Sequence, residues 1–180
     1  TEWLPQAERH DSVDGDRDQC VTHAAEYVAA RVRSLGLRDD PAPDVNRDSR
    51  HQHLSDVLAR AYGSRAVALL KRDRIQHELS RHPCPVPTLI DGKMRRLEWI
   101  RGGSLPVKTD FEQHGLGKTE LNVTDPAYDL AEAILHFGLS PEEERVLLAR
   151  YIEESGDAGV RERLILNALL AGTRAMNGAM

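Results

Sequence analysis

Three closely spaced prolines limit the possible folds of this chain more than any other feature. Pro83, Pro85 and Pro87 directly follow a long stretch in which apolar residues recur with helical spacing. Proline lacks a backbone donor and fixes φ, so a helix cannot continue through this run. Beyond it the spacing changes to that of short strands, up to about residue 111, and then returns to helical. The sequence therefore predicts a mainly α fold with a small β-hairpin.

Apolar spacing predicts helices before the prolines. One covers residues 18–35 and is ended by Gly36. A charged segment at about 39–50, rich in Pro, Asp and Arg, is typical of a mobile linker. Further helices are predicted over 54–62 and 64–81. The expected inner positions are Val21, Ala24, Ala25, Val28, Ala29, Val32 and Leu35 in the first helix, and Ala66, Leu69, Leu70, Ile75 and Leu79 in the last.

The strand-like region predicts a hairpin. A short strand at 88–90 leads into Asp91-Gly92, an extended segment covers 94–101, and a partner strand runs from 105 to 111 after a glycine pair. Asp-Gly is itself a common hairpin turn, so Asp91 is open to a purely local interpretation.

Three helices are predicted after the hairpin, over residues 125–137, 140–155 and 159–176. The middle one has the strongest start signal, because Ser140 suits the N-cap, Pro141 suits the first helical position, and acids follow.

Composition excludes several classes of protein. The 180 residues suit one domain or one large lobe of a two-lobed protein, and a net charge of -5 without a basic stripe argues against nucleic-acid binding. No apolar run approaches the roughly 20 residues that span a bilayer, so no membrane partner is expected. Cys20 and Cys84 lie far apart, which favours a reducing cytoplasmic location.

An acid at the end of a short apolar strand is the strongest candidate for chemistry. Asp110 follows Val107-Lys108-Thr109 and precedes a polar loop. A carboxylate at a fixed point of this kind can hold a divalent ion against phosphate oxygens. The alternative is a solvated acid at a strand end.

Two motifs resemble those of the aminoglycoside phosphotransferase and choline kinase superfamily, which shares the protein-kinase fold. Asp125-Pro126-Ala127-Tyr128-Asp129-Leu130-Ala131 is similar to its Asp-Pro-x-x-Asp-Leu-Ala helix opening, and Asp110-Phe111-Glu112 to its metal-binding segment. Segments 94–99 and 108–115 look similar to those of a less characterised branch. The resemblance covers roughly 64–176. It implies a helical C-terminal lobe of a kinase-like α+β fold over 64–180, after an N-terminal helical segment over 1–63.

The resemblance implies a small-molecule phosphotransferase. Such an enzyme transfers a phosphoryl group from ATP, or another nucleoside triphosphate, to a hydroxyl acceptor, with Mg held at Asp110. In this superfamily a helix leads to a catalytic loop, a hairpin, the metal-binding aspartate and then the Asp-Pro helix. Asp129 is expected to accept hydrogen bonds from the catalytic-loop backbone, whereas Asp125 is expected to cap its helix.

The catalytic base is altered relative to the superfamily pattern. The string His-x-Asp, followed five residues later by Asn, is absent. Asp91 lies 19 residues before Asp110, close to where the base belongs, so we expect it to accept the acceptor's proton. Glu98 lies near the Asn position and is expected to be a second magnesium ligand. Its alternative is a surface acid beside Trp99.

Lys108 and His114 flank Asp110 and are the candidate nucleotide-binding residues. For His114 the alternative is a purely structural role in the loop. The segment Gly115–Thr119 resembles the end of a phosphate-binding loop, but its glycine spacing fails, so we interpret it as a flexible loop.

The superfamily holds its nucleotide with a Gly-rich turn and an ion-paired lysine in an N-terminal lobe, which we call the nucleotide grip, and the sequence before Ser64 contains no counterpart of it. No Gly-rich turn and no lysine occur there in the expected setting, since the first lysine is Lys71. A separate N-terminal lobe or partner chain is therefore expected. Two alternatives stay open: a non-catalytic kinase-like lobe acting as a binding or regulatory module, and a helical scaffold whose motif match is chance.

Overall fold

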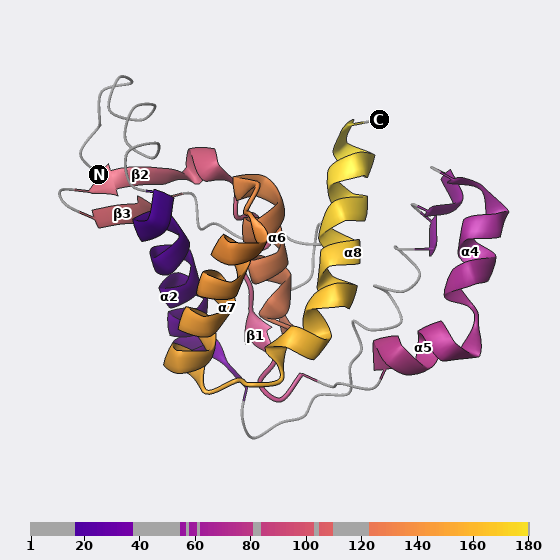
Figure 1. Ribbon diagram of the computed structural model, residues 1–180, viewed down its shortest axis with the longest axis horizontal. Coiled ribbons are helices and arrows are strands. Elements are labelled where there is room, and N and C mark those ends of the chain that lie inside the picture. The colour runs from indigo at the N-terminus through magenta and orange to yellow at the C-terminus, as the bar shows by residue number, and fades with distance from the viewer. Residues whose placement is uncertain are drawn as a thin grey trace.

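The computed structural model describes residues 17–37, 55–56, 58–60, 62–80, 84–102, 105–109 and 123–179. Most of these residues are helical, and the strands are short (Figure 1). The predicted fold class, mainly α with a small β-hairpin, is therefore confirmed. The elements are α2 (Arg17–Leu35), α4 (Ser64–Leu70), α5 (Asp73–Ser80), β1 (Thr88–Leu89), the 3-10 helix η1 (Arg96–Glu98), β2 (Trp99–Gly102), β3 (Leu105–Lys108), β4 (Val123–Thr124), α6 (Ala127–Phe137), α7 (Pro141–Ser155) and α8 (Val160–Ala179).

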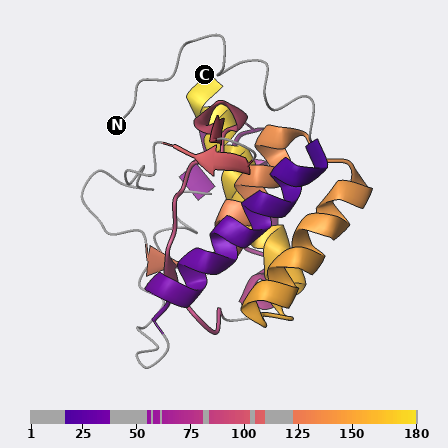
Figure 2. The ribbon, with the colours of Figure 1, turned by 90° about the vertical axis from the view of Figure 1, so that its left-hand side faces the viewer.

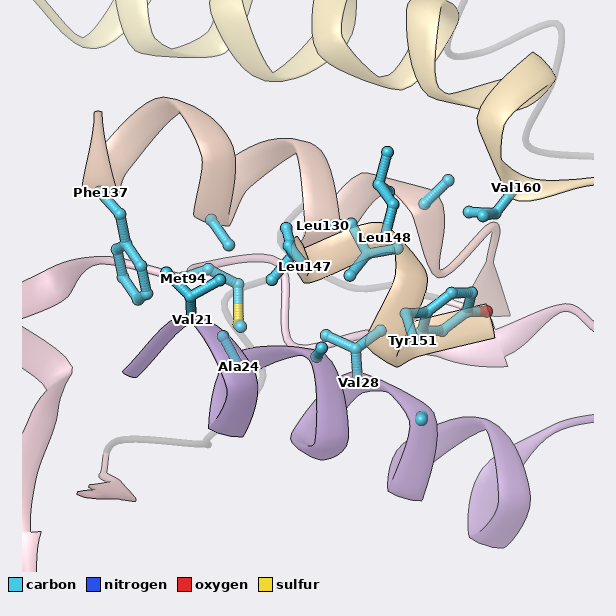
Figure 3. Close-up of a cluster of buried hydrophobic side chains, with 14 of the residues drawn as sticks. Val21, Ala24, Val28, Met94, Leu130, Phe137, Leu147, Leu148, Tyr151 and Val160 are labelled. Carbon is cyan, nitrogen blue, oxygen red and sulfur yellow. The ribbon is translucent and has the colours of Figure 1, made fainter. Parts of the chain in front are cut away.

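The main hydrophobic core lies between α2, α6 and α7. Helices α2 and α7 run side by side (Figure 2), and their apolar faces meet in Figure 3. All predicted inner positions of α2 are buried except Leu35, which is 41% exposed at the helix end. Burial of a Val or Leu side chain contributes about 1.5–3 kcal/mol. The residues that meet here include Val21, Ala24 and Val28 of α2, Leu130 and Phe137 of α6, and Leu147, Leu148 and Tyr151 of α7.

Residues 127–133 of helix α6 are all buried, while Leu135 in its last turn is exposed. The helix lies between α2 and α8 (Figure 1), and α8 closes its second side with a smaller cluster that includes Ile90, Tyr128 and Leu170. A helix that is apolar on nearly all sides is expected to be buried in this way. Its two acids, Asp129 and Glu132, are consequently buried with it and need hydrogen-bonding partners.

The strands form two small antiparallel pairs. Strands β2 and β3 make the predicted hairpin, with Trp99 opposite Lys108. Strand β1 pairs instead with β4, so that Thr88 lies opposite Thr124. Asp91-Gly92 is therefore not a tight turn between paired neighbours, and the hairpin-turn interpretation is wrong. The extended segment predicted from residue 94 includes the 3-10 turn η1 before β2 begins.

The single helix predicted over 64–81 is two helices. Helix α4 ends at Leu70, and α5 begins at Asp73, whose charge suits a helix N-terminus. The Gln76 side-chain amide donates to the Leu70 carbonyl and so satisfies one of the free acceptors at the end of α4. Leu69 and Ile75 were predicted as inner positions but are 52% and 40% exposed.

The helices predicted over 125–137, 140–155 and 159–176 agree with α6, α7 and α8, whereas part of the helix predicted over 54–62 lies outside the described residues. Ser140 caps α7 through a reciprocal bond pair with Glu143, and Pro141 is the first helical residue. Helix α2 shares its core with the C-terminal helices. The predicted boundary between segments 1–63 and 64–180 stays a prediction, because the proposed linker at 39–50 lies outside the described residues. Within the described ranges, none of the helices has the length and apolar character that crossing a bilayer requires.

Candidate functional site

The loop that follows β1 is held against the first turn of α6. The Asp129 carboxylate accepts hydrogen bonds from the backbone N–H of Asp91 (2.8 Å) and of Gly92 (2.8 Å). The expectation that this helix aspartate accepts bonds from loop backbone is thereby confirmed. Burial raises the pKa of Asp129 to about 7, although the two N–H donors act to lower it. Two backbone N–H bonds to one carboxylate fix the direction in which the loop leaves β1.

Helix α8 holds the same loop from the other side. Arg174 donates to the Gly92 carbonyl (2.7 Å) and to the Tyr128 hydroxyl (3.2 Å). Tyr128 in turn donates to Glu132 (3.1 Å). Gly92 has φ 75, a left-handed conformation that a residue with a Cβ adopts only at a cost. The loop conformation is thus determined by side chains from two helices and by its own glycine.

Asp91 is a buried carboxylate, and among the described residues only one of its two oxygens has a partner. Its exposed fraction is 1%. Oδ2 accepts from the Tyr27 hydroxyl (2.6 Å) and lies 3.3 Å from Lys108 Nζ. Oδ1 is buried and has no hydrogen-bond partner among the described residues. A buried charged oxygen without a partner is costly, so this atom is placed to accept from a group outside those ranges.

Glu98 and two lysines complete the cluster. Lys108 Nζ lies 3.0 Å from Glu98 Oε2, and Lys93 Nζ lies 2.8 Å from Oε1. Thr109 fixes the hairpin position of Glu98, because its N–H and its hydroxyl both donate to the Glu98 carbonyl (2.7 and 2.9 Å). Two carboxylates, Asp91 and Glu98, are therefore compensated by two ammonium groups. We call Asp91, Lys93, Glu98 and Lys108 the Asp91 cluster.

The Asp91 cluster is a favourable environment for a cation. The carboxylates of Asp91 and Glu98 converge on one ammonium, and carboxylate oxygens are also the ligands that Mg²⁺ prefers. Glu98 fits a magnesium ligand in chemistry, yet both of its oxygens already face lysines. A metal ion there would displace Lys93 or Lys108 from one oxygen. No group of three metal-ligating side chains is found in the part of the chain that the structure describes.

The structure brings together three of the predicted site residues. Asp91, Glu98 and Lys108 come from the loop, from η1 and from β3, respectively. Glu98 is 8% exposed, so its interpretation as a surface acid is wrong. Asp110, His114 and the segment Gly115–Thr119 lie outside the described residues. The metal and nucleotide roles of these side chains stay predictions.

Four residues of the site were missed from sequence: Lys93, Arg174, Tyr27 and Arg31. Tyr27 and Arg31 lie one turn apart on α2, beside its buried stripe. Arg31 donates to the Tyr27 hydroxyl (3.1 Å) and, through Nε and Nη2, to the Leu89 carbonyl (3.1 and 2.9 Å). The available signal was a tyrosine with an arginine four residues later at the edge of an apolar face, in a chain with only 4% aromatic residues.

A second buried cluster lies where α6 begins. Asp125 accepts from the N–H of Ala127 (3.0 Å), the first residue of α6, although the N-cap position of this helix is Pro126, one residue later than the predicted cap. Its other oxygen accepts from Arg163 (3.0 Å) and Asn167 (3.2 Å) of α8, which the sequence did not indicate. Arg163 also pairs with Asp157. We call Asp125, Asp157, Arg163 and Asn167 the Asp125 cluster. Both oxygens of Asp125 are engaged within the protein.

Comparisons with family models, with curated proteins and with solved structures find no match for this chain. The functional argument therefore depends on the motifs and on the geometry of the Asp91 cluster.

Proposed function

We propose that this chain forms the catalytic lobe of a small-molecule phosphotransferase with a kinase-like fold. The lobe transfers a phosphoryl group from ATP, or another nucleoside triphosphate, to a hydroxyl acceptor, and Asp91 accepts the acceptor's proton. The observation that carries this proposal is the state of Asp91. It is a buried, firmly held carboxylate whose Oδ1 has no partner among the described residues. A positioned base of this kind contributes roughly 10²–10⁴-fold to a rate.

The order of the elements supports the same proposal. The loop that holds Asp91 is followed by the β2–β3 hairpin, by the Asp110 segment and by α6. This is the order that the resemblance implies for catalytic loop, hairpin, metal-binding aspartate and helix. The bonds from the Asp91 and Gly92 backbone to Asp129 are also those expected of the superfamily's helix aspartate.

Each charged residue has a role in this proposal. Asp110 and Glu98 would hold Mg²⁺, which neutralises phosphate charge when bound. Lys108 and His114 bind phosphate oxygens, and Lys108 also forms an ion pair with Asp91 Oδ2. A separate N-terminal lobe or partner chain supplies the rest of the nucleotide grip. Cys20 and Cys84 form no disulfide with each other, in keeping with a reducing cytoplasm.

One observation favours a non-catalytic binding or regulatory module instead. Lys93 and Lys108 already neutralise Glu98 and Asp91, so the cluster is charge-balanced without any ligand. A lobe that has lost catalysis retains such a cluster only for its structural value. This second candidate predicts no dependence of nucleotide binding on the acids.

Calorimetric titration with MgATP distinguishes the two candidates. The full-length gene product, together with any partner chain that supplies the rest of the nucleotide grip, is titrated as wild type, as Asp110→Ala and as Glu142→Ala, a control at an exposed acid of α7. We expect binding in the wild type and in the control, and its loss in Asp110→Ala. Asp91→Asn should keep MgATP binding but lose transfer of labelled phosphate to choline or an aminoglycoside. Absence of magnesium-dependent binding in the wild type would overturn the proposal.

A further inference from the structure

We infer that Tyr27 of α2 is a positioning residue for Asp91, which holds Oδ2 so that Oδ1 is the oxygen that accepts the proton. The inference rests on the proposed function of Asp91, and it assigns a role to a residue that belongs to none of the motifs. In the step that it serves, the acceptor O–H bond breaks and its proton passes to Oδ1. The acceptor oxygen forms the new O–P bond, and the nucleoside diphosphate leaves with the electron pair of the broken P–O bond.

The contact between Tyr27 and Asp91 fixes the rotation of the carboxylate. Tyr27 donates to Oδ2 at 2.6 Å, in the range of a charge-assisted bond, and Lys108 Nζ lies 3.3 Å from the same oxygen. Rotation about the bond to the carboxyl carbon would exchange the two oxygens. The two groups on Oδ2 oppose that rotation, so the lone pairs of Oδ1, which has no partner among the described residues, keep a fixed direction.

Tyr27 is itself held from two sides. Arg31 donates to its hydroxyl (3.1 Å), and the Arg31 guanidinium lies 5.5 Å from the centre of the Tyr27 ring. The Trp99 ring packs edge-on against the Tyr27 ring with centroids 5.7 Å apart. Arg31 also binds the Leu89 carbonyl, two residues before Asp91. Helix α2 therefore holds both the acid and the strand that carries it.

The phenol keeps its proton in this environment. Burial and the hydrogen bond to the Asp91 carboxylate both raise the pKa of Tyr27 above its ordinary value. At neutral pH Tyr27 is thus a donor to Asp91 and does not compete with it for the acceptor's proton. Its contribution is orientation, and misplacement of a reacting group by about 1 Å can cost about 100-fold in rate.

Tyr27→Phe tests the inference with little disturbance, because the ring and its contact with Trp99 are kept. We expect kcat for phosphate transfer to fall by about tenfold to a hundredfold, with KM for MgATP unchanged. Tyr62→Phe is the matched control, since Tyr62 is 63% exposed and its hydroxyl donates to Met176 and not to Asp91. An unchanged kcat, or a rise in KM at unchanged kcat, would overturn the inference.

A second measurement needs no catalytic activity. NMR of ¹³C-labelled tyrosine follows the titration of the Tyr27 phenol in the wild type and in Asp91→Asn. We expect the pKa of Tyr27 to fall in Asp91→Asn, because the phenol loses its charged acceptor. An unchanged titration would contradict the Tyr27–Asp91 contact, and therefore this inference, but it would leave the proposed function untouched. A wild type that shows this coupling but does not transfer phosphate would instead contradict the proposed function, and with it the positioning role of Tyr27 in phosphate transfer.

Discussion

The two buried clusters at the start of α6 differ in how completely their carboxylates are engaged. Asp125 uses one oxygen to bind the Ala127 N–H at the start of the helix and the other to bind Arg163 and Asn167. Asp91 has donors on Oδ2 only, and its Oδ1 has no partner among the described residues. The first arrangement is complete without a ligand, whereas the second is not. Engagement of both oxygens is what a structural acid needs, and a free oxygen is what a reacting acid needs.

The comparison between Asp125 and Asp91 is one between carboxylate oxygens, which are the charged atoms of the two clusters. Two neutral acceptors near Asp125, the Thr124 hydroxyl and the Asn167 amide oxygen, are also buried without described partners. A neutral acceptor costs less to leave unpaired than a carboxylate oxygen does. The difference between the two aspartates therefore suggests that the Asp125 cluster serves stability and that the Asp91 cluster gives up some stability for function.

Arg163→Met should produce the largest effect, because it removes the centre of the Asp125 cluster. Asp125 and Asp157 would lose their shared guanidinium in a buried setting, at a cost of about 3–5 kcal/mol in unfolding free energy. Urea denaturation followed by circular dichroism measures the loss. Arg161→Met, at an exposed position of the same helix, is the control and should change little. A loss of less than about 1 kcal/mol would contradict a structural role for the cluster.

Asp129→Asn should release the loop that carries Asp91, at a cost of about 2 kcal/mol. The amide has one acceptor oxygen for two backbone donors, so the N–H of Asp91 or of Gly92 loses its partner. Hydrogen exchange at these two amides should accelerate while exchange in α7 stays unchanged. Equal acceleration in α7 would mean that the substitution acts on the whole fold.

The same aspartate gives a pH dependence with a defined sign. The pKa of Asp129 is raised from 3.8 to about 7 on folding, mainly by burial. Between these values the folded protein binds a proton that the unfolded chain does not, so the contribution to stability falls as pH rises through about 7. Urea midpoints measured across this range should show a decline that is weaker in Asp129→Asn. Identical slopes in the two proteins would contradict this assignment.

Lys108→Met should have a smaller effect of about 1–2 kcal/mol, because each carboxylate keeps another donor. Asp91 retains Tyr27, and Glu98 retains Lys93. The substitution also removes the ammonium on which the two acids converge, so millimolar Mg²⁺ should raise the unfolding temperature of the variant more than that of the wild type. An equal response in both proteins would argue against a cation site formed by these two acids.

The sequence predicted the helices well where burial follows a simple period. The stripe of α2 and the capping signals of α7 specify their elements locally, and both are found. The break between α4 and α5 was missed because apolar residues continue with helical spacing across Lys71 and Arg72. Exposure of Leu69 and Ile75 depends on which elements pack against them, and periodicity does not report that.

The sequence predicted only those residues of the candidate site that are close to one another along the chain. Asp91, Glu98 and Lys108 are close in sequence, so a hairpin model brings them together. Tyr27 lies 64 residues before Asp91, and the pairing depends on how α2 packs. Arg163 and Asp125, 38 residues apart, present the same difficulty. Long-range polar contacts of this kind leave no periodic trace in a single sequence.

The most direct test compares the unfolding free energies of Asp91→Asn and Asp125→Asn, measured in urea at the same pH. Asp125→Asn weakens charged hydrogen bonds to Arg163 and Asn167, so we predict a loss of about 2–3 kcal/mol. Asp91→Asn removes the charge of a buried carboxylate whose Oδ1 has no described partner. We therefore predict that the unfolding free energy changes by less than about 1 kcal/mol, or increases. An equal loss in both variants would show that Asp91 is as structural as Asp125 and would contradict the account.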